Sequence, residues 1–147
     1  MSKAPALAPT IEKTKSTFIK PLTDDFDVRS AWRRGNHTIV IGFGIAGQNI
    51  VEAMRELEIP FAIIEANYDN FKKLNAQNLP VTFGDATKER ILLSAGIEHA
   101  KLVVITVSSA VATRHIQAAV LKMRPDVRII LRVQYLQELE DLHELEH

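Results

Sequence analysis

The chain of 147 residues contains no cysteine, which excludes disulfides, thiolate metal sites and a cysteine nucleophile. It has no apolar run near the roughly 18 residues that a membrane-spanning helix needs. Its N-terminus also lacks the basic-then-apolar order of a secretory signal. We therefore expect a soluble chain from a reducing compartment.

The chain also lacks an excess of charge, because 18 Lys and Arg balance 18 Asp and Glu. This balance argues against nucleic acid as a partner, since phosphate backbones are bound by clustered positive charge. The charges are unevenly placed, however, with seven basic and four acidic side chains in residues 1–35. That segment has three prolines in its first 21 positions and little periodicity. We interpret residues 1–35 as a linker or flexible N-terminal arm, whose basic side chains could lie near anionic lipid.

From residue 36 on, short apolar runs alternate with helical patterns, and an apolar content of 46% is enough for one core. This alternation predicts parallel strands joined by crossover helices. The strands are expected at 39–41, 61–64, 81–83, 102–105 and 127–131, with helices between them. The right-handed crossover rule then gives the strand order 3-2-1-4-5 in a Rossmann-like, doubly wound sheet with three α/β/α layers.

The most informative stretch is T-I-V-I-G-F-G-I-A-G at residues 38–47, a strand followed by a glycine turn and a helix. In this pattern Gly42 permits the tight turn, Gly44 lets the backbone approach a pyrophosphate, and Gly47 lets the helix pack on the strand. The first N–H groups of that helix lack intrahelical partners and lie at the positive end of its dipole. The motif predicts an anion site, although three glycines at this spacing also occur in turns that bind nothing.

The second strand ends in Glu65, 23 positions beyond Gly42 and close to the roughly 20 at which a carboxylate accepts hydrogen bonds from a ribose diol. A glutamate there repels a 2′-phosphate, so we do not expect NADP. The alternative is a doubly wound domain in which Glu65 is an ordinary surface glutamate.

The loop G-D-A-T at residues 84–87 follows the third strand and lies at the same sheet edge. Gly84 would let a ligand approach the backbone, and Asp85 could accept a hydrogen bond from an adenine amine. Capping of the next helix by Asp85 or Thr87 explains the same residues equally well.

Polar residues also follow the last two strands. Thr106 and Ser108 could contact a phosphate or a second nucleotide, although serine caps are common at such positions. Arg132 is the cation at a strand's carboxyl end, where a phosphate contact competes with a salt bridge. From Gln134, leucines recur at threefold spacing, and this stripe needs a sheet edge or another subunit to cover it. The final residues 145–147 resemble the start of a histidine tag.

The segments I-V-I-G-F-G-I-A-G-Q, I-I-E-A-N, F-G-D-A-T, L-V-V-I-T-V and I-I-L-R-V together resemble the TrkA-N, or RCK N-terminal, domain over about residues 37–142. The G-D-A-T loop is the specific part, and the Kef-type branch is the most similar. On this resemblance residues 36–147 are a C-terminally truncated nucleotide-binding domain. It implies a homodimeric regulatory module on the cytoplasmic face of the inner membrane, which gates a potassium efflux or cation:proton antiporter domain in the same polypeptide.

The same resemblance implies which residues bind the ligand. The phosphate would be held by residues 43–46, the ribose by Glu65, and the adenine by residues 84–86. Thr106 and Ser108 match the family less firmly. The predicted cofactor-binding residues are Gly42, Phe43, Gly44, Ile45, Ala46, Gly47, Glu65, Ala66, Gly84, Asp85, Ala86, Thr87, Thr106, Ser108 and Arg132. Family members bind NAD(H), AMP or ATP, so AMP or NAD(H) is expected and ATP is a further candidate.

The alternative function is a small NAD-dependent oxidoreductase. Such an enzyme needs a substrate domain with a general acid or base near the nicotinamide, and only a short helix follows the cofactor fold. The histidines fall at strand or helix ends or in the tag-like terminus: His37, His99, His115, His143 and His147. None pairs with a second catalytic group and no metal cluster is evident, so we predict no catalytic residues, no metal site and no enzyme activity.

Overall fold

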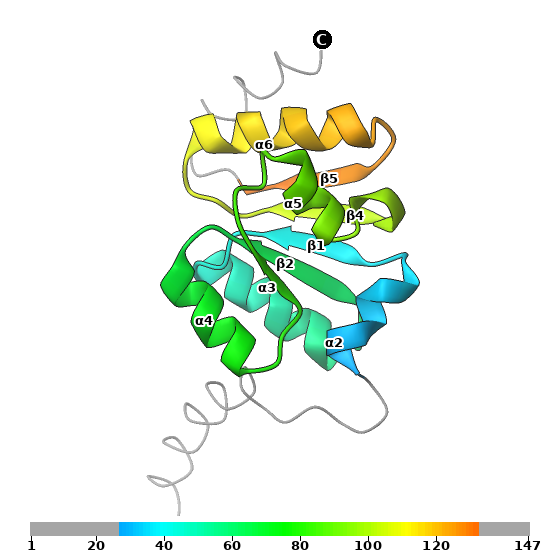
Figure 1. Ribbon diagram of the computed structural model, residues 1–147, viewed down its shortest axis with the longest axis vertical. Coiled ribbons are helices and arrows are strands. Elements are labelled where there is room, and N and C mark those ends of the chain that lie inside the picture. The colour runs from blue at the N-terminus through cyan, green and yellow to red at the C-terminus, as the bar shows by residue number, and fades with distance from the viewer. Residues whose placement is uncertain (1–26, 133–147) are drawn as a thin grey trace, which may run out of the picture.

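The computed structural model describes residues 27–132 and contains one sheet of five parallel strands (Figure 1). The strands are β1 (Thr38–Ile41), β2 (Phe61–Glu65), β3 (Val81–Phe83), β4 (Leu102–Ile105) and β5 (Arg128–Leu131). The main helices are α3 (Ile45–Glu56), α4 (Tyr68–Ala76), α5 (Glu89–Ser94) and α6 (Ala110–Met123). The order β3-β2-β1-β4-β5 confirms the predicted Rossmann-like fold.

Helices cover both faces of the sheet, so alternate side chains of one strand enter two different cores. Ile39 and Ile41 of β1 pack in the core that α5 and α6 complete. Val40 between them packs in the core that α3 and α4 complete, together with Val51 and Leu74. Because both faces are covered, all residues of β1 and β2 are buried. This explains why both strands read as continuous apolar runs.

The folded part begins earlier than predicted. Helix α2 (Val28–Ala31) and the 3-10 helix η1 (Trp32–Arg34) lie inside the segment that we interpreted as a linker. The Asp27 side chain caps α2 by accepting from the Arg29 N–H, and Val28 is fully buried in the α3–α4 core. One buried valine and one cap give no periodicity, so the sequence pattern did not reveal this helix.

Helix α3 ends earlier than its apolar spacing indicated. Leu57 lies at helical spacing from Met54, but it is the C-cap residue and is 70% exposed. Glu58 then takes a positive φ of 55°, which turns the chain away from the helix toward β2. The predicted leucine-striped helix from Gln134 lies outside the described residues.

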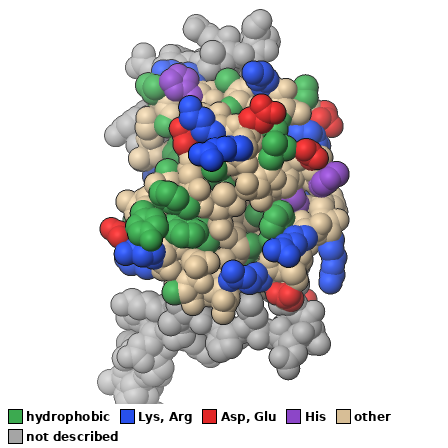
Figure 2. All heavy atoms as spheres, in the orientation of Figure 1, with side chains coloured by type: hydrophobic (Ala, Val, Ile, Leu, Met, Phe, Trp, Pro, Cys, Tyr) green, Lys and Arg blue, Asp and Glu red, His purple; other side chains and the backbone are tan. Residues whose placement is uncertain are grey.

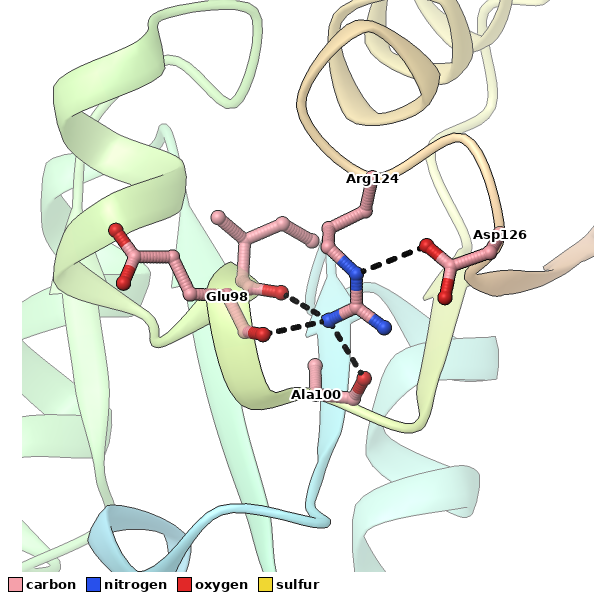
Figure 3. A network of polar contacts seen from close by, with 5 residues as sticks. Glu98, Ala100, Arg124 and Asp126 are labelled. Atoms are coloured by element: carbon pink, nitrogen blue, oxygen red, sulfur yellow. Dashed lines mark hydrogen bonds and ion pairs between the residues drawn. The ribbon is translucent and has the colours of Figure 1, made fainter.

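At the amino edge of the sheet, Arg124 at the end of α6 holds the 3-10 helix η2 (Ile97–His99) through backbone carbonyls (Figure 3). Its Nη1 donates to the carbonyl oxygens of Ile97 and Glu98, both at 2.8 Å, and of Ala100 at 3.2 Å. Its Nε donates to Asp126 at 3.2 Å. One guanidinium therefore ties together the loops that precede β4 and β5.

A buried histidine closes the same edge. His37 is fully buried, and its Nε2 lies 2.8 Å from the Ala95 carbonyl oxygen, to which the neutral ring donates. Nδ1 then has no hydrogen-bond partner among residues 27–132. Burial lowers the pKa of His37, since a charged ring would lose its water.

Within residues 27–132, no helix is long and apolar enough to cross a membrane.

Candidate functional site

The glycine turn lies at the carboxyl edge of the sheet, between β1 and α3. Gly42 has a φ of 95°, a conformation that favours glycine. A Cβ on Gly47 would lie 2.3 Å from the Gly42 carbonyl oxygen, so α3 can approach the turn this closely only with glycine there. The turn and packing roles predicted for these two glycines therefore agree with the geometry.

Thr106 braces this turn from β4. Its hydroxyl donates to the carbonyl oxygens of Ile41 and Gly42, each at 3.0 Å, and the residue is 5% exposed. We predicted that this hydroxyl could contact a phosphate, but its proton is directed at the protein backbone. Thr106 therefore stabilises the glycine turn, and its hydroxyl is no donor to a ligand in this arrangement.

A cavity of about 400 Å³ lies over the N-terminus of α3. Gly44 is the N-cap of α3, and no side chain caps this helix, whereas Asn67 caps α4 and Ser109 caps α6. A Cβ on Gly44 would meet no described atom within 4 Å. With a φ of −78°, neither conformation nor packing requires glycine at this position. The space beside it is thus open to an anion at the positive end of α3.

A second cavity, of about 360 Å³, adjoins the first on the side of α6. Gly42, Glu65 and Val107 line both cavities, so the two meet over the ends of β1, β2 and β4. The other predicted residues in the first cavity are Phe43, Gly44, Ile45, Ala46, Thr106, Ser108 and Arg132. Those in the second are Ala66, Gly84, Asp85, Ala86 and Thr87. Of all predicted site residues, only Gly47 lines neither cavity.

Glu65 stands where the two cavities meet. It is 7% exposed, and its Oε1 accepts a hydrogen bond from the Asn67 N–H at 2.8 Å. This bond fixes the direction of the carboxylate at the end of β2. The Asn67 side chain in turn accepts from the Asn70 N–H and begins α4. The carboxylate is therefore held by a local structure that the sequence supplies within a few residues.

The G-D-A-T loop is held by its own hydrogen bonds, which removes helix capping as the alternative explanation of Asp85 and Thr87. Asp85 Oδ1 accepts from both the N–H and the hydroxyl of Thr87, each at 2.8 Å. The N-cap of α5 is Lys88, without a side-chain cap, so neither Asp85 nor Thr87 caps this helix. The two Thr87 hydrogen bonds lower the pKa of Asp85, because they stabilise its charged form. A carboxylate is therefore kept ionised at the mouth of the second cavity.

Packing requires glycine at position 84, which the sequence analysis did not predict. A Cβ there would lie 2.5 Å from Cδ1 of Ile91, a buried residue of α5. The glycine lets α5 pack directly against the end of β3. Ligand approach to the backbone is thus no longer needed to explain a glycine at this position.

Several cavity residues escaped the sequence analysis. Val107 lines both cavities, Asn70 reaches the first from α4, and Ala112 and His115 reach the second from α6. We placed the histidines at element ends, but His115 lies inside α6. Its spacing from Ala112 marks one helical face, which is informative only once α6 is known to cross this edge. No group of residues suited to a metal ion occurs within the described part of the chain.

The fold and the glycine turn define a Rossmann-like α/β domain, and the comparison with protein families is specific. The TrkA-N domain model matches residues 38–146, so the chain belongs to the TrkA-N domain family. The putative cation/proton antiporter YbaL of Escherichia coli is 28% identical over 104 residues, which are 71% of this chain and 19% of YbaL. Potassium channel protein 1 of Methanocaldococcus jannaschii is 32% identical over 109 residues, or 73% of this chain and 33% of that protein.

Solved structures agree with the family. The TrkA-N domain of the E. coli inner membrane protein YbaL has a TM-score of 0.70 and 27% identity, covering 75% of this chain and 82% of that one. The AMP-bound Kef C-terminal domain of Shewanella denitrificans has a TM-score of 0.66 at 22% identity, covering 75% and 66%. The NAD-bound GsuK channel has a TM-score of 0.68 at 20% identity, covering 94% and 24%. The last two likenesses show the shared fold.

Proposed function

We propose that this domain binds an adenine nucleotide at the carboxyl edge and thereby regulates a potassium efflux or cation:proton antiporter. The observation that carries the proposal is the open space beside Gly44 at the uncapped N-terminus of α3. Residues 43–46 would hold a phosphate there through backbone N–H groups. Glu65 would hold the ribose, and the cavity beside Asp85 would hold the adenine.

The ligand that we propose is AMP or NAD(H), with ATP as a further candidate. Cavities of about 400 and 360 Å³ are within the size range of small-molecule sites. The relatives with this fold include one structure bound to AMP and another bound to NAD. The buried carboxylate of Glu65 disfavours NADP, since a 2′-phosphate would bring a second negative charge to the ribose site.

Regulation requires a domain with two states of different nucleotide affinity. We propose that a homodimer of this domain supplies those states and that a membrane antiporter domain in the same polypeptide responds to them. The support is that the relatives that the chain matches are much longer antiporters and channels, of which it spans 19% and 33%. In that setting the domain lies on the cytoplasmic face of the membrane and performs no chemistry.

Calorimetric titration of the chain with AMP, ATP, NAD, NADH and NADP tests the binding proposal. We expect binding of at least one of the first four, with NADP weakest. Glu65→Ala should weaken binding by about 1.5–3 kcal/mol, the usual loss for a hydrogen bond to a charged group. Glu89→Ala removes the same charge from an exposed position of α5 and serves as the matched control. Absence of binding by every nucleotide, or equal effects of the two variants, would contradict the proposal.

A further inference from the structure

The short helices before β1 carry an excess of positive charge. Residues 27–35 contain three arginines and one aspartate. Arg29, Arg33 and Arg34 are all exposed on α2 and η1. Figure 2 shows Lys and Arg side chains gathered in the lower right part of the surface, where α2 lies in Figure 1. Part of the basic character that the sequence places before residue 36 therefore belongs to the folded domain.

A small cavity opens beside these arginines at the amino edge of the sheet. It measures about 120 Å³ and is lined by Arg29, Trp32 and Arg33 together with polar residues such as Asn75 and Thr82. Among residues 27–132, no acidic side chain belongs to its lining. Its polar lining is thus made of cations and neutral hydrogen-bonding groups, which is the composition of an anion site.

Both guanidinium groups at this cavity are positioned without a carboxylate. Arg29 Nη1 donates to Asn78 Oδ1 at 3.1 Å, and the Arg33 guanidinium carbon lies 5.8 Å from the centre of the Trp32 ring. No carboxylate within residues 27–132 forms an ion pair with Arg29 or Arg33. The nearby Asp27 accepts from the Arg29 N–H and the Ser30 hydroxyl at the start of α2. The positive charge of the pair therefore faces outward and is available to an external anion.

We propose that this arginine site binds the phosphate headgroup of an anionic membrane lipid. Guanidinium groups match phosphate oxygens in pairs, and the cavity beside them is lined by groups that can donate hydrogen bonds to those oxygens. The site lies at the edge opposite the nucleotide crevice, so both can be occupied at once. The preceding 26 residues hold four lysines and three acids and add a small positive excess. Proximity to a membrane rests on the proposed attachment to an antiporter.

Co-sedimentation of the full chain with vesicles tests this site. The vesicles are phosphatidylcholine alone or phosphatidylcholine with about one third phosphatidylglycerol, at fixed ionic strength. We expect binding only to the anionic vesicles and a loss of about 25-fold in Arg29→Gln/Arg33→Gln, or about fivefold per arginine. Lys88→Gln/Arg90→Gln removes the same charge from exposed positions near the opposite edge and should change binding less than about twofold.

Three results would overturn the assignment. Equal losses of vesicle binding in the two double variants would indicate that binding depends on net charge alone. Undiminished binding by Arg29→Gln/Arg33→Gln would indicate that other cations bind the vesicles. Displacement from the vesicles by inorganic phosphate at constant ionic strength would instead indicate a site for a free anion. Thermal unfolding checks that each variant folds. Titration of the same proteins with AMP and NAD keeps the two proposals separate, because the arginine variants should bind nucleotide as the wild type does.

Discussion

Two large cavities lie at the carboxyl edge of the sheet, whereas side chains at the amino edge hold the loops together and leave one smaller cavity. At the carboxyl edge, backbone groups of the glycine turn and the carboxylates of Glu65 and Asp85 surround two cavities. At the amino edge, Arg124 binds three carbonyl oxygens and His37 binds another. All strands run in parallel, so one edge collects the ends from which helices begin and the other collects the returning loops. The comparison indicates that most of the space for a ligand lies at the carboxyl edge, whereas the amino edge mainly stabilises the loops.

The largest expected effect comes from the amino edge. Arg124→Ala removes the donor for three carbonyl oxygens and should lower the free energy of unfolding by about 3 kcal/mol, because hydrogen bonds to charged groups are strong. Nucleotide affinity should stay unchanged. Urea unfolding and calorimetric titration measure the two quantities, and Arg128→Ala at an exposed position of β5 is the control. If nucleotide affinity falls together with stability, the two edges are not independent.

The two glycines of the turn should separate stability from binding at the carboxyl edge. Gly47→Ala places a methyl group against the Gly42 carbonyl oxygen and should cost about 2 kcal/mol of stability, as overpacking does. Gly44→Ala enters open space and should change stability by less than about 0.5 kcal/mol.

Nucleotide binding by the Gly44→Ala and Gly47→Ala variants is the second quantity to measure. Gly44→Ala fills the proposed phosphate space and should weaken nucleotide binding at least about tenfold, which corresponds to 1.4 kcal/mol. Thermal unfolding and titration of both variants give the result. Unchanged affinity in a stable Gly44→Ala protein would remove the main support for the phosphate position.

The smallest effect concerns pH and the amino edge. Because burial lowers the pKa of His37, the unfolded chain takes up a proton first as the pH falls. The contribution of the neutral His37 ring to stability is therefore complete above pH 6.5, the ordinary pKa of histidine. This contribution is lost as the pH falls toward the lower pKa of His37 in the folded state. We expect the free energy of unfolding to fall by about 1 kcal/mol between pH 7 and pH 5.5, as measured by urea unfolding. His37→Gln should flatten this dependence, whereas His115→Gln at an exposed position of α6 should retain it.

The strands were predictable because their residues carry the information locally. A strand buried on both faces needs a continuous apolar run, and β1, β2 and β4 have one each. Helix α2 was missed because its place in the core depends on Val28 meeting side chains of α3 and α4. The end of α3 is not evident from the sequence, because Leu57 has helical spacing but follows the last helical turn. Spacing alone does not show where a helix stops.

The candidate site likewise contains residues that the sequence identified and residues that only the structure revealed. The glycine turn and Glu65 were found because a strand, a turn and an acid at a set distance lie close together in the sequence. Val107, Asn70 and His115 were missed, since each reaches a cavity only through the packing of its own element. Thr106 and Asp85 were found, but their hydrogen bonds to backbone and to Thr87 showed roles that the sequence had left open.

The sequence by itself determined the order of strands and helices, the parallel sheet and the glycine turn that follows the first strand. These features depend on the pattern of apolar residues and glycines over a few neighbouring positions. Only the tertiary structure decided that two cavities adjoin at Glu65 and that arginines of α2 and η1 surround a third at the opposite edge. Such features require residues from distant elements to meet, and their spacing along the chain does not encode the distances between them.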